Sequence, residues 1–325
     1  MKKLVSLLTI ILLTANVYSQ KKEETFKASG KPFAKVFTNY HSTFSDGGNH
    51  NVFEIQRAYL GYAYTLSKKF SGKVNIDVGN PGVGKLDMTA YLKNAYVQYN
   101  DGRLTTKFGL IGLSQFKMQE KQWGGRYIYK SFQDKHKFGH SADLGLFASY
   151  KLHDKISIDA TIANGDGYKS VEADSLFKYS VGVTLHPVKG VDFRAYYDVM
   201  GNDDAQQTLS FYLGYGADNM KIGAEYNRQL NTKMTEDQDR AGLSFYASYK
   251  MKKIRLFGRF DQLSSVEIGN ATDPWNYGKD GSGIIAGFEF VPVKGVTVAP
   301  NYQLWTPENG NPVVNMVYMN CEIKF

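Results

Sequence analysis

The chain has 325 residues, one cysteine, 14% aromatic residues and a formal net charge of +8. A single cysteine excludes a disulfide scaffold. After the first twenty residues there is no apolar run of about 18 or more, which excludes a helical membrane span. The basic excess is modest and spread along the chain, which disfavours nucleic-acid binding.

The first residues have the pattern of an export signal. Lys2 and Lys3 precede an apolar core that is too short to cross a bilayer. We therefore expect residues 1–19 to be a signal peptide and residues 20–31 a short periplasmic leader. Residues 32–325 are predicted to form one domain.

Within that domain, apolar and polar residues alternate with a period of two, which predicts strands with one apolar and one polar face. The polar face carries many charges, so it must meet water and cannot be a dry core. The first strand alternates poorly, Phe257 breaks the pattern, and Pro300 predicts a bulge or a misplaced boundary. Sixteen strands are predicted, over residues 33–44, 53–66, 69–79, 88–99, 103–113, 142–151, 154–163, 177–186, 190–199, 207–217, 219–229, 240–250, 253–262, 282–291, 295–304 and 315–325.

The connections between these strands alternate in length. Those after even-numbered strands are short, and those after odd-numbered strands are mostly longer, as in outer-membrane barrels. The longest covers residues 114–141. The pattern predicts an all-β protein, a transmembrane antiparallel barrel of sixteen strands with short periplasmic turns and longer extracellular loops.

Aromatic residues gather at the ends of the predicted strands, as expected at the two membrane interfaces. Leu185 is the exception in the periplasmic belt. Phe325 ends a last alternating strand that resembles the segment read by the barrel assembly machinery. The periplasmic belt is Tyr64, Tyr99, Tyr150, Tyr215, Tyr249, Phe290 and Phe325, and the outer belt is Tyr40, Tyr197, Tyr226, Phe260 and Tyr302.

Several motifs, in their order along the chain, resemble the porins related to the phosphate-selective porins O and P. They are F-E-I-Q-R-A-Y-L-G-Y at 53–62, K-N-A-Y-V-Q-Y at 93–99, K-F-G-L-I-G-L-S-Q-F at 107–116, A-D-L-G-L at 142–146 and A-N-G-D-G at 163–167. The resemblance runs over most of the domain. It implies a sixteen-stranded barrel, usually a homotrimer, that passes small anions or other small solutes.

The predicted inward positions carry charges of both signs, whereas the phosphate-selective members line their pore with a basic ladder. Strict phosphate selectivity is therefore not carried over to this chain. The predicted lumen-facing charges are Arg57, Lys73, Asp77, Lys107, Arg194, Lys221, Arg255 and Arg259.

The segment 114–141 is the best candidate for a functional element, because it is basic and rich in aromatic residues. We hypothesise that it folds into the lumen and forms a basic constriction that favours anions. Gly124 and Gly125 would permit the sharp turn this needs. The alternative is a solvated outer loop that grips lipopolysaccharide phosphates. The predicted constriction residues are Lys117, Lys121, Arg126, Lys130, Lys135 and Lys137.

No motif nominates an enzyme, a cofactor or a metal centre. His136 and His140 are four residues apart, which is a ligand spacing only on a helix, and no acidic cluster accompanies them in the sequence. We expect an integral outer-membrane porin for passive diffusion of small hydrophilic solutes, leaning towards anions, with phosphate among the candidates. The alternative function is a structural or adhesive outer-membrane barrel with an occluded lumen.

Overall fold

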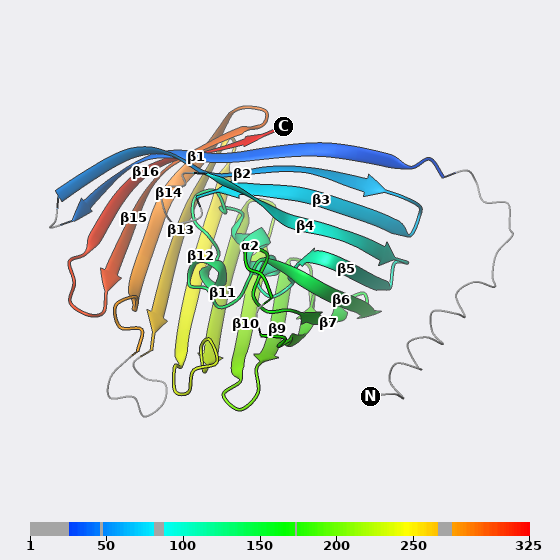
Figure 1. Ribbon diagram of the computed structural model, residues 1–325. Coiled ribbons are helices and arrows are strands. Elements are labelled where there is room, and N and C mark those ends of the chain that lie inside the picture. Colours follow the sequence, from blue (N-terminus) through cyan, green and yellow to red (C-terminus); the bar gives the residue numbers. More distant parts are fainter. Residues whose placement is uncertain (1–25, 46–47, 81–87, 173, 266–274) are drawn as a thin grey trace, which may run out of the picture.

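The protein is a single closed barrel of antiparallel strands, seen here in a computed structural model (Figure 1). The structure describes residues 26–45, 48–80, 88–172, 174–265 and 275–325. Each strand pairs with its sequence neighbours, and β1 closes the ring by pairing with β16. Among the described residues, no helix is long and apolar enough to cross a bilayer. The predicted signal peptide and most of the predicted leader lie outside the described residues.

Sixteen strands form the ring, which confirms the predicted number and order. The strands are β1 (Ser29–Ser45), β2 (Gly48–Thr65), β3 (Phe70–Gly79), β4 (Thr89–Asn100), β5 (Leu104–Gly112), β6 (Ala142–His153), β7 (Ile156–Ala163), β8 (Lys178–Leu185), β9 (Val191–Met200), β10 (Gln206–Gly216), β11 (Met220–Leu230), β12 (Arg240–Met251), β13 (Ile254–Ser264), β14 (Gly281–Val293), β15 (Val296–Pro307) and β16 (Val314–Lys324). Two short helices, α2 (Lys117–Trp123) and α3 (Phe132–Lys135), lie between β5 and β6.

Two sequence predictions need correction. Strand β1 begins at Ser29, so the last residues of the predicted leader belong to the barrel, paired with the end of β2. Pro300 marks neither a bulge nor a boundary. It lies within β15, opposite Met319 of β16, and β14 pairs with β15 on both sides of it. Strand β15 tolerates the N–H that Pro300 lacks, because the residues on both sides of it remain paired with β14 and β16.

The connections after even-numbered strands are short and gather at one end of the barrel, which we call the turn end. Those after odd-numbered strands lie at the other, the loop end, and are mostly longer, although only residues 46–47 separate β1 from β2. Both aromatic belts lie on the outward face, where Tyr64, Tyr150 and Tyr249 near the turn end and Tyr40 and Tyr226 near the loop end are exposed. Aliphatic side chains such as Leu213 and Val181 fill the band between them and are also exposed. A barrel with this outward surface can bury it only in an apolar medium.

Two β-bulges change which side chains face the lumen. Gln56 is an extra residue in β2, because Phe37 pairs with Arg57 while Thr38 pairs with Ile55. Likewise Lys93 is an extra residue in β4, opposite the step between Asn75 and Ile76. A bulge shifts the inward and outward alternation by one residue, so both Arg57 and Lys93 point into the lumen.

The outward face provides a test of the membrane depth of the barrel. Replacing Val181, at the centre of β8, with arginine should destabilise the barrel by about 2–4 kcal/mol, since the charge would lie in hydrocarbon. Gln207→Arg at the loop end of β10 is the matched control and should cost at most about 1 kcal/mol. Urea unfolding in lipid vesicles measures both, and equal costs would contradict the depth assignment.

Candidate pore constriction

The connection between β5 and β6 folds into the barrel, and we call residues 113–141 the inward loop. Figure 1 shows α2 inside the ring of strands rather than above it. The loop is closed at its base by a hydrogen bond from the Leu113 N–H to the Ser141 carbonyl, 3.1 Å long. Gly124, with φ of 67°, ends α2 in the left-handed conformation and turns the chain, as predicted.

The apolar side of the inward loop packs against one half of the barrel wall. Trp123 is 1% exposed, and its ring lies 5.6 Å from that of Tyr246 and 5.8 Å from that of Phe257. Tyr127 packs against Phe37 of β1. These contacts explain why Phe257 breaks the alternation of its strand and why Phe37 of the first strand points inward, because both rings lie against the loop.

Hydrogen bonds fix the same side of the loop to strands β10 to β16. Arg259 donates to the Lys130 carbonyl at 2.8 Å, and Arg240 donates to the His136 and Lys137 carbonyls. Such charge-assisted bonds satisfy loop carbonyls that no secondary structure pairs. Further bonds join Gln122 to the Tyr215 carbonyl, Gln133 to Ser210 and Glu225, Tyr127 to Glu289, and Asn320 to the Tyr127 carbonyl.

The opposite side of the loop carries a charged strip made of Glu120, Arg126, Lys130 and Asp134. Arg126 pairs with Glu120 at 3.2 Å and with Asp134 at 3.1 Å, and Lys130 lies 3.7 Å from Asp134. Burial alone would raise the pKa of Asp134, but Arg126 and Lys130 outweigh it and hold the pKa below its usual value. Burial lowers the pKa of Lys130 to about 8, although Asp134 opposes the shift.

A second charged group lies across the lumen, on β2 to β4. Arg57 and Lys93 both pair with Asp77, at 2.6 and 3.5 Å. Electrostatic interactions reach from Arg57 to Arg126 and Lys130 of the charged strip. We call the space between this wall and the charged strip the narrowing.

The sequence analysis missed one contributor to the narrowing, which comes from the connection between β7 and β8. Tyr168 donates to Asp77 at 2.6 Å, and the Lys169 ammonium lies 4.5 Å from the centre of the Tyr91 ring. Gly165 and Gly167 have φ of 107° and 81°, and a Cβ at Gly167 would lie 2.5 Å from the His140 ring. The glycines of the A-N-G-D-G motif therefore indicated a turn that points into the lumen rather than an ordinary surface turn.

The six predicted constriction residues separate into two groups. Lys117, Arg126 and Lys130 face the open side of the lumen. Lys121 lies instead near Lys221 on the opposite wall. Lys135 lies 4.8 Å from the Tyr129 ring centre, near Asp261 and Arg259 of β13, and Lys137 is exposed where Arg240 anchors the loop backbone. Propensity and composition could not separate these residues, because the packing of the loop decides which side faces the lumen.

The eight predicted lumen-facing charged residues all point inward, but some form ion pairs and others do not. Arg194, Arg255 and Arg259 form ion pairs with Asp159, Glu289 and Asp261, and Arg194 and Arg259 are buried. Arg57 and Asp77 pair with each other at the narrowing. Lys73, Lys107 and Lys221 have no ion-pair partner within the described ranges.

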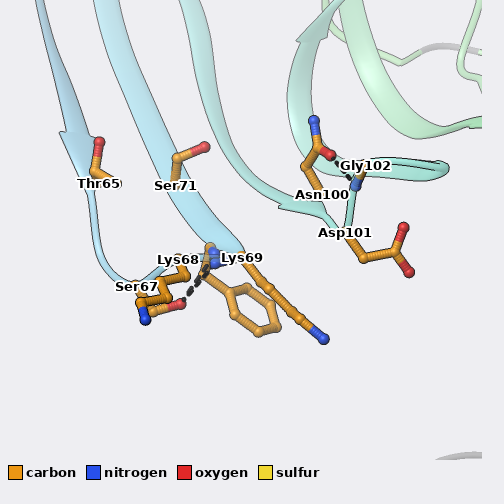
Figure 2. A pocket seen from close by; sticks show the side chains of 9 residues that line it. Thr65, Ser67, Lys68, Lys69, Ser71, Asn100, Asp101 and Gly102 are labelled. Carbon is orange, nitrogen blue, oxygen red and sulfur yellow. Dashed lines mark hydrogen bonds between the residues drawn. The ribbon is translucent and has the colours of Figure 1, made fainter. Parts of the chain in front are cut away.

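Two other features of the described residues do not belong to the narrowing. Asp166, Glu172 and Asp174 have carboxylate oxygens within 4.8 Å of one another, but two of the three residues are exposed, as is common without an ion. A hollow of about 490 Å³ lies between the turns after β2 and β4 (Figure 2). Its polar groups complete the turns themselves, since Ser67 accepts from the Phe70 N–H and Asn100 from the Gly102 N–H.

Comparison with known proteins identifies the fold. No family model matches this sequence, and neither does any curated protein. Salmonella typhi OmpF, in a complex with daunomycin, is 16% identical, with 91% of this chain and 97% of that chain covered and a TM-score of 0.64. A loop-deleted OmpT from Vibrio cholerae is 12% identical (92% and 99% covered, TM-score 0.60), and Pseudomonas aeruginosa OpdL is 9% identical (91% and 99%, TM-score 0.55). At such identities the similarity shows a shared porin-type barrel. The expected relation to the phosphate-selective subgroup is not confirmed.

The packing of Trp123 allows a test of how the loop is held. Trp123→Ala should remove about 3–5 kcal/mol of packing and release part of the loop from its wall. In planar bilayers the variant should show larger and noisier currents than the unmodified protein. Tyr226→Ala removes an outward aromatic residue as a control. Unchanged current noise in the Trp123 variant would show that this contact does not hold the loop.

The lowered pKa of Lys130 gives a pH test. Between about pH 7 and about pH 9 the ammonium loses its proton, so any preference for anions should fall as the pH rises. Lys130→Arg should reduce the fall, because arginine stays charged throughout this range. Reversal potentials in a salt gradient measure the effect, with Lys137→Arg as the control. An equal fall in Lys130→Arg would assign the titration to another group.

Proposed function

We propose that this chain is an integral outer-membrane porin that lets small hydrophilic solutes diffuse passively and favours anions. The observation that carries the proposal is the charge around the open side of the lumen. Eight cationic side chains and three carboxylates lie at the narrowing and on β3 and β5 beside it. The cations are Arg57, Lys73, Lys93, Lys107, Lys117, Arg126, Lys130 and Lys169, and the carboxylates are Asp77, Glu120 and Asp134.

Fixed positive charge beside a narrow, protein-walled passage lowers the barrier for anions and raises it for cations. The inward loop concentrates this effect, because its apolar side covers β10 to β16 and leaves solutes only the space beside the basic wall. Water reaches that wall, since Lys117 and Lys169 are exposed although they lie within the barrel. Selectivity for phosphate over other anions is one possible refinement of the same function.

The membrane orientation follows from the same proposal. The turn end would face the periplasm and the loop end the outside, where long loops would meet lipopolysaccharide. Phe325 would present the last strand to the barrel assembly machinery. A homotrimer is the assembly we propose, and one solved form of Vibrio cholerae OmpT, which is 12% identical to this chain with a TM-score of 0.59, is described as a trimer.

Charge reversal at the open side of the lumen tests the proposed selectivity. The double variant Lys117→Glu with Lys130→Glu should shift the reversal potential towards cations, because the net charge beside the passage falls by four units. The control is Lys137→Glu with Lys189→Glu, which changes the net charge equally at the loop backbone anchor and in the turn after β8. Reversal potentials are measured in planar bilayers with a salt gradient.

The two possible failures of this experiment have different meanings. If the unmodified protein gives no open-channel current, the porin function is wrong and a structural or adhesive barrel with an occluded lumen takes its place. If current flows but the two double variants shift the reversal potential equally, the passage does not run beside the charged strip.

A further inference from the structure

Three lysines on the open side of the lumen have no counter-charge, and we call Lys73, Lys107 and Lys117 the lysine wall. None forms an ion pair with any residue in the described part of the chain. The charges that act on Lys73 are those of Lys117, Lys93 and Lys35, and those that act on Lys107 are Lys117 and Lys73, so every one is cationic. Ammonium groups that repel one another in a partly buried place favour an anion between them.

The directions of two of these lysines separate their charges. The Lys73 ammonium lies 5.0 Å from the centre of the Phe33 ring, which belongs to β1. The Lys107 ammonium lies 5.0 Å from the Phe147 ring, on β6. The Lys107 ammonium also lies 5.7 Å from the centre of the Tyr96 ring on β4, so it stays above its own strand β5, whereas Lys73 on β3 leans away towards β1. Two strand spacings and the offset in register put their Cα atoms roughly 10–12 Å apart.

An aromatic residue lies between the two ammonium groups. Tyr96 of β4 pairs directly with Lys73 on one side and with Gly109 on the other. Gly109 has no side chain to cover the ring, and a Cβ there would lie 2.4 Å from the Ala95 carbonyl oxygen. The wall therefore presents positive charge, then an apolar ring, then positive charge.

The third lysine lies towards the loop end of the same surface. The Lys117 Nζ is 4.0 Å from the position that a Cβ at Gly112 would take, so it lies over β5 rather than against the loop's own carboxylates. It adds positive charge above the other two without closing the space over Tyr96.

We propose that the lysine wall is a binding site for short linear dicarboxylates, such as succinate, within the porin function proposed above. One carboxylate pairs with Lys73, the other with Lys107, and the methylene groups lie over Tyr96. A compact anion such as inorganic phosphate cannot reach both ammonium groups while they stay over Phe33 and Phe147. A monocarboxylate can occupy only one end. The site therefore selects anions by the distance between their two carboxylates, in addition to the general preference of the pore for anions.

The test measures interruption of chloride current through single channels in planar bilayers. Succinate should reduce the current at lower concentration than acetate or inorganic phosphate at equal ionic strength. Lys73→Gln and Lys107→Gln should each weaken the block by succinate roughly fivefold, to the level of acetate, because one carboxylate loses its partner. Lys221→Gln is the matched control, since it removes an inward ammonium from the opposite wall and should leave the block unchanged.

Calorimetric titration of succinate into the detergent-solubilised protein tests the site independently of conduction. Succinate binding that Lys73→Gln and Lys107→Gln weaken and Lys221→Gln does not would support the site even in a closed channel. An anion-selective channel in which phosphate blocks as strongly as succinate would overturn the site and leave the porin function intact. The same conclusion would follow if Lys221→Gln weakened the block as much as the other two variants.

Discussion

Closure of the sheet is the constraint on which the rest of the structure depends. A strand in a lipid bilayer has no water to satisfy its N–H and C=O groups, so each strand needs a partner on both sides. Pairing of β1 with β16, from Lys35 with Lys324 to Phe44 with Asn315, removes the last free edges. The closed ring then has two distinct surfaces, and every strand must place apolar residues on one and polar residues on the other.

The inward loop turns this symmetrical ring into an asymmetrical passage. Trp123, Tyr127 and Phe132 occupy the half of the lumen along β10 to β16 together with β1, where inward aromatic and hydrogen-bonding residues receive them. The open side of the lumen is lined chiefly by β2 to β6, and cationic side chains predominate there. Selectivity, in the function we propose, is thus a consequence of where the loop's apolar side packs as much as of its composition.

Predictability from the sequence was greatest where the pattern repeats. The period of two located every strand to within a few residues, and the alternation of short and long connections located both ends of the barrel. Phe257 broke that pattern, and Phe37 lies in the first strand, which alternates poorly; nothing local explains an inward aromatic residue at either position. Their explanation is Tyr127 and Trp123, which are about 90 and 134 residues away along the chain and which only the folded loop brings beside them.

The sequence alone determined the class of fold, the two faces of each strand and the segment able to narrow the lumen, because these depend on local periodicity and length. Only the tertiary structure decided which charges remain available to a solute. In the sequence, Arg194 and Arg259 look like unpaired cations on the inward face of a strand. In the structure, Asp159 and Asp261 pair with them and neutralise their charge. Lys73 and Lys107 escape pairing since the residues near their ammonium groups are aromatic rings and other cations, an arrangement set by register between strands.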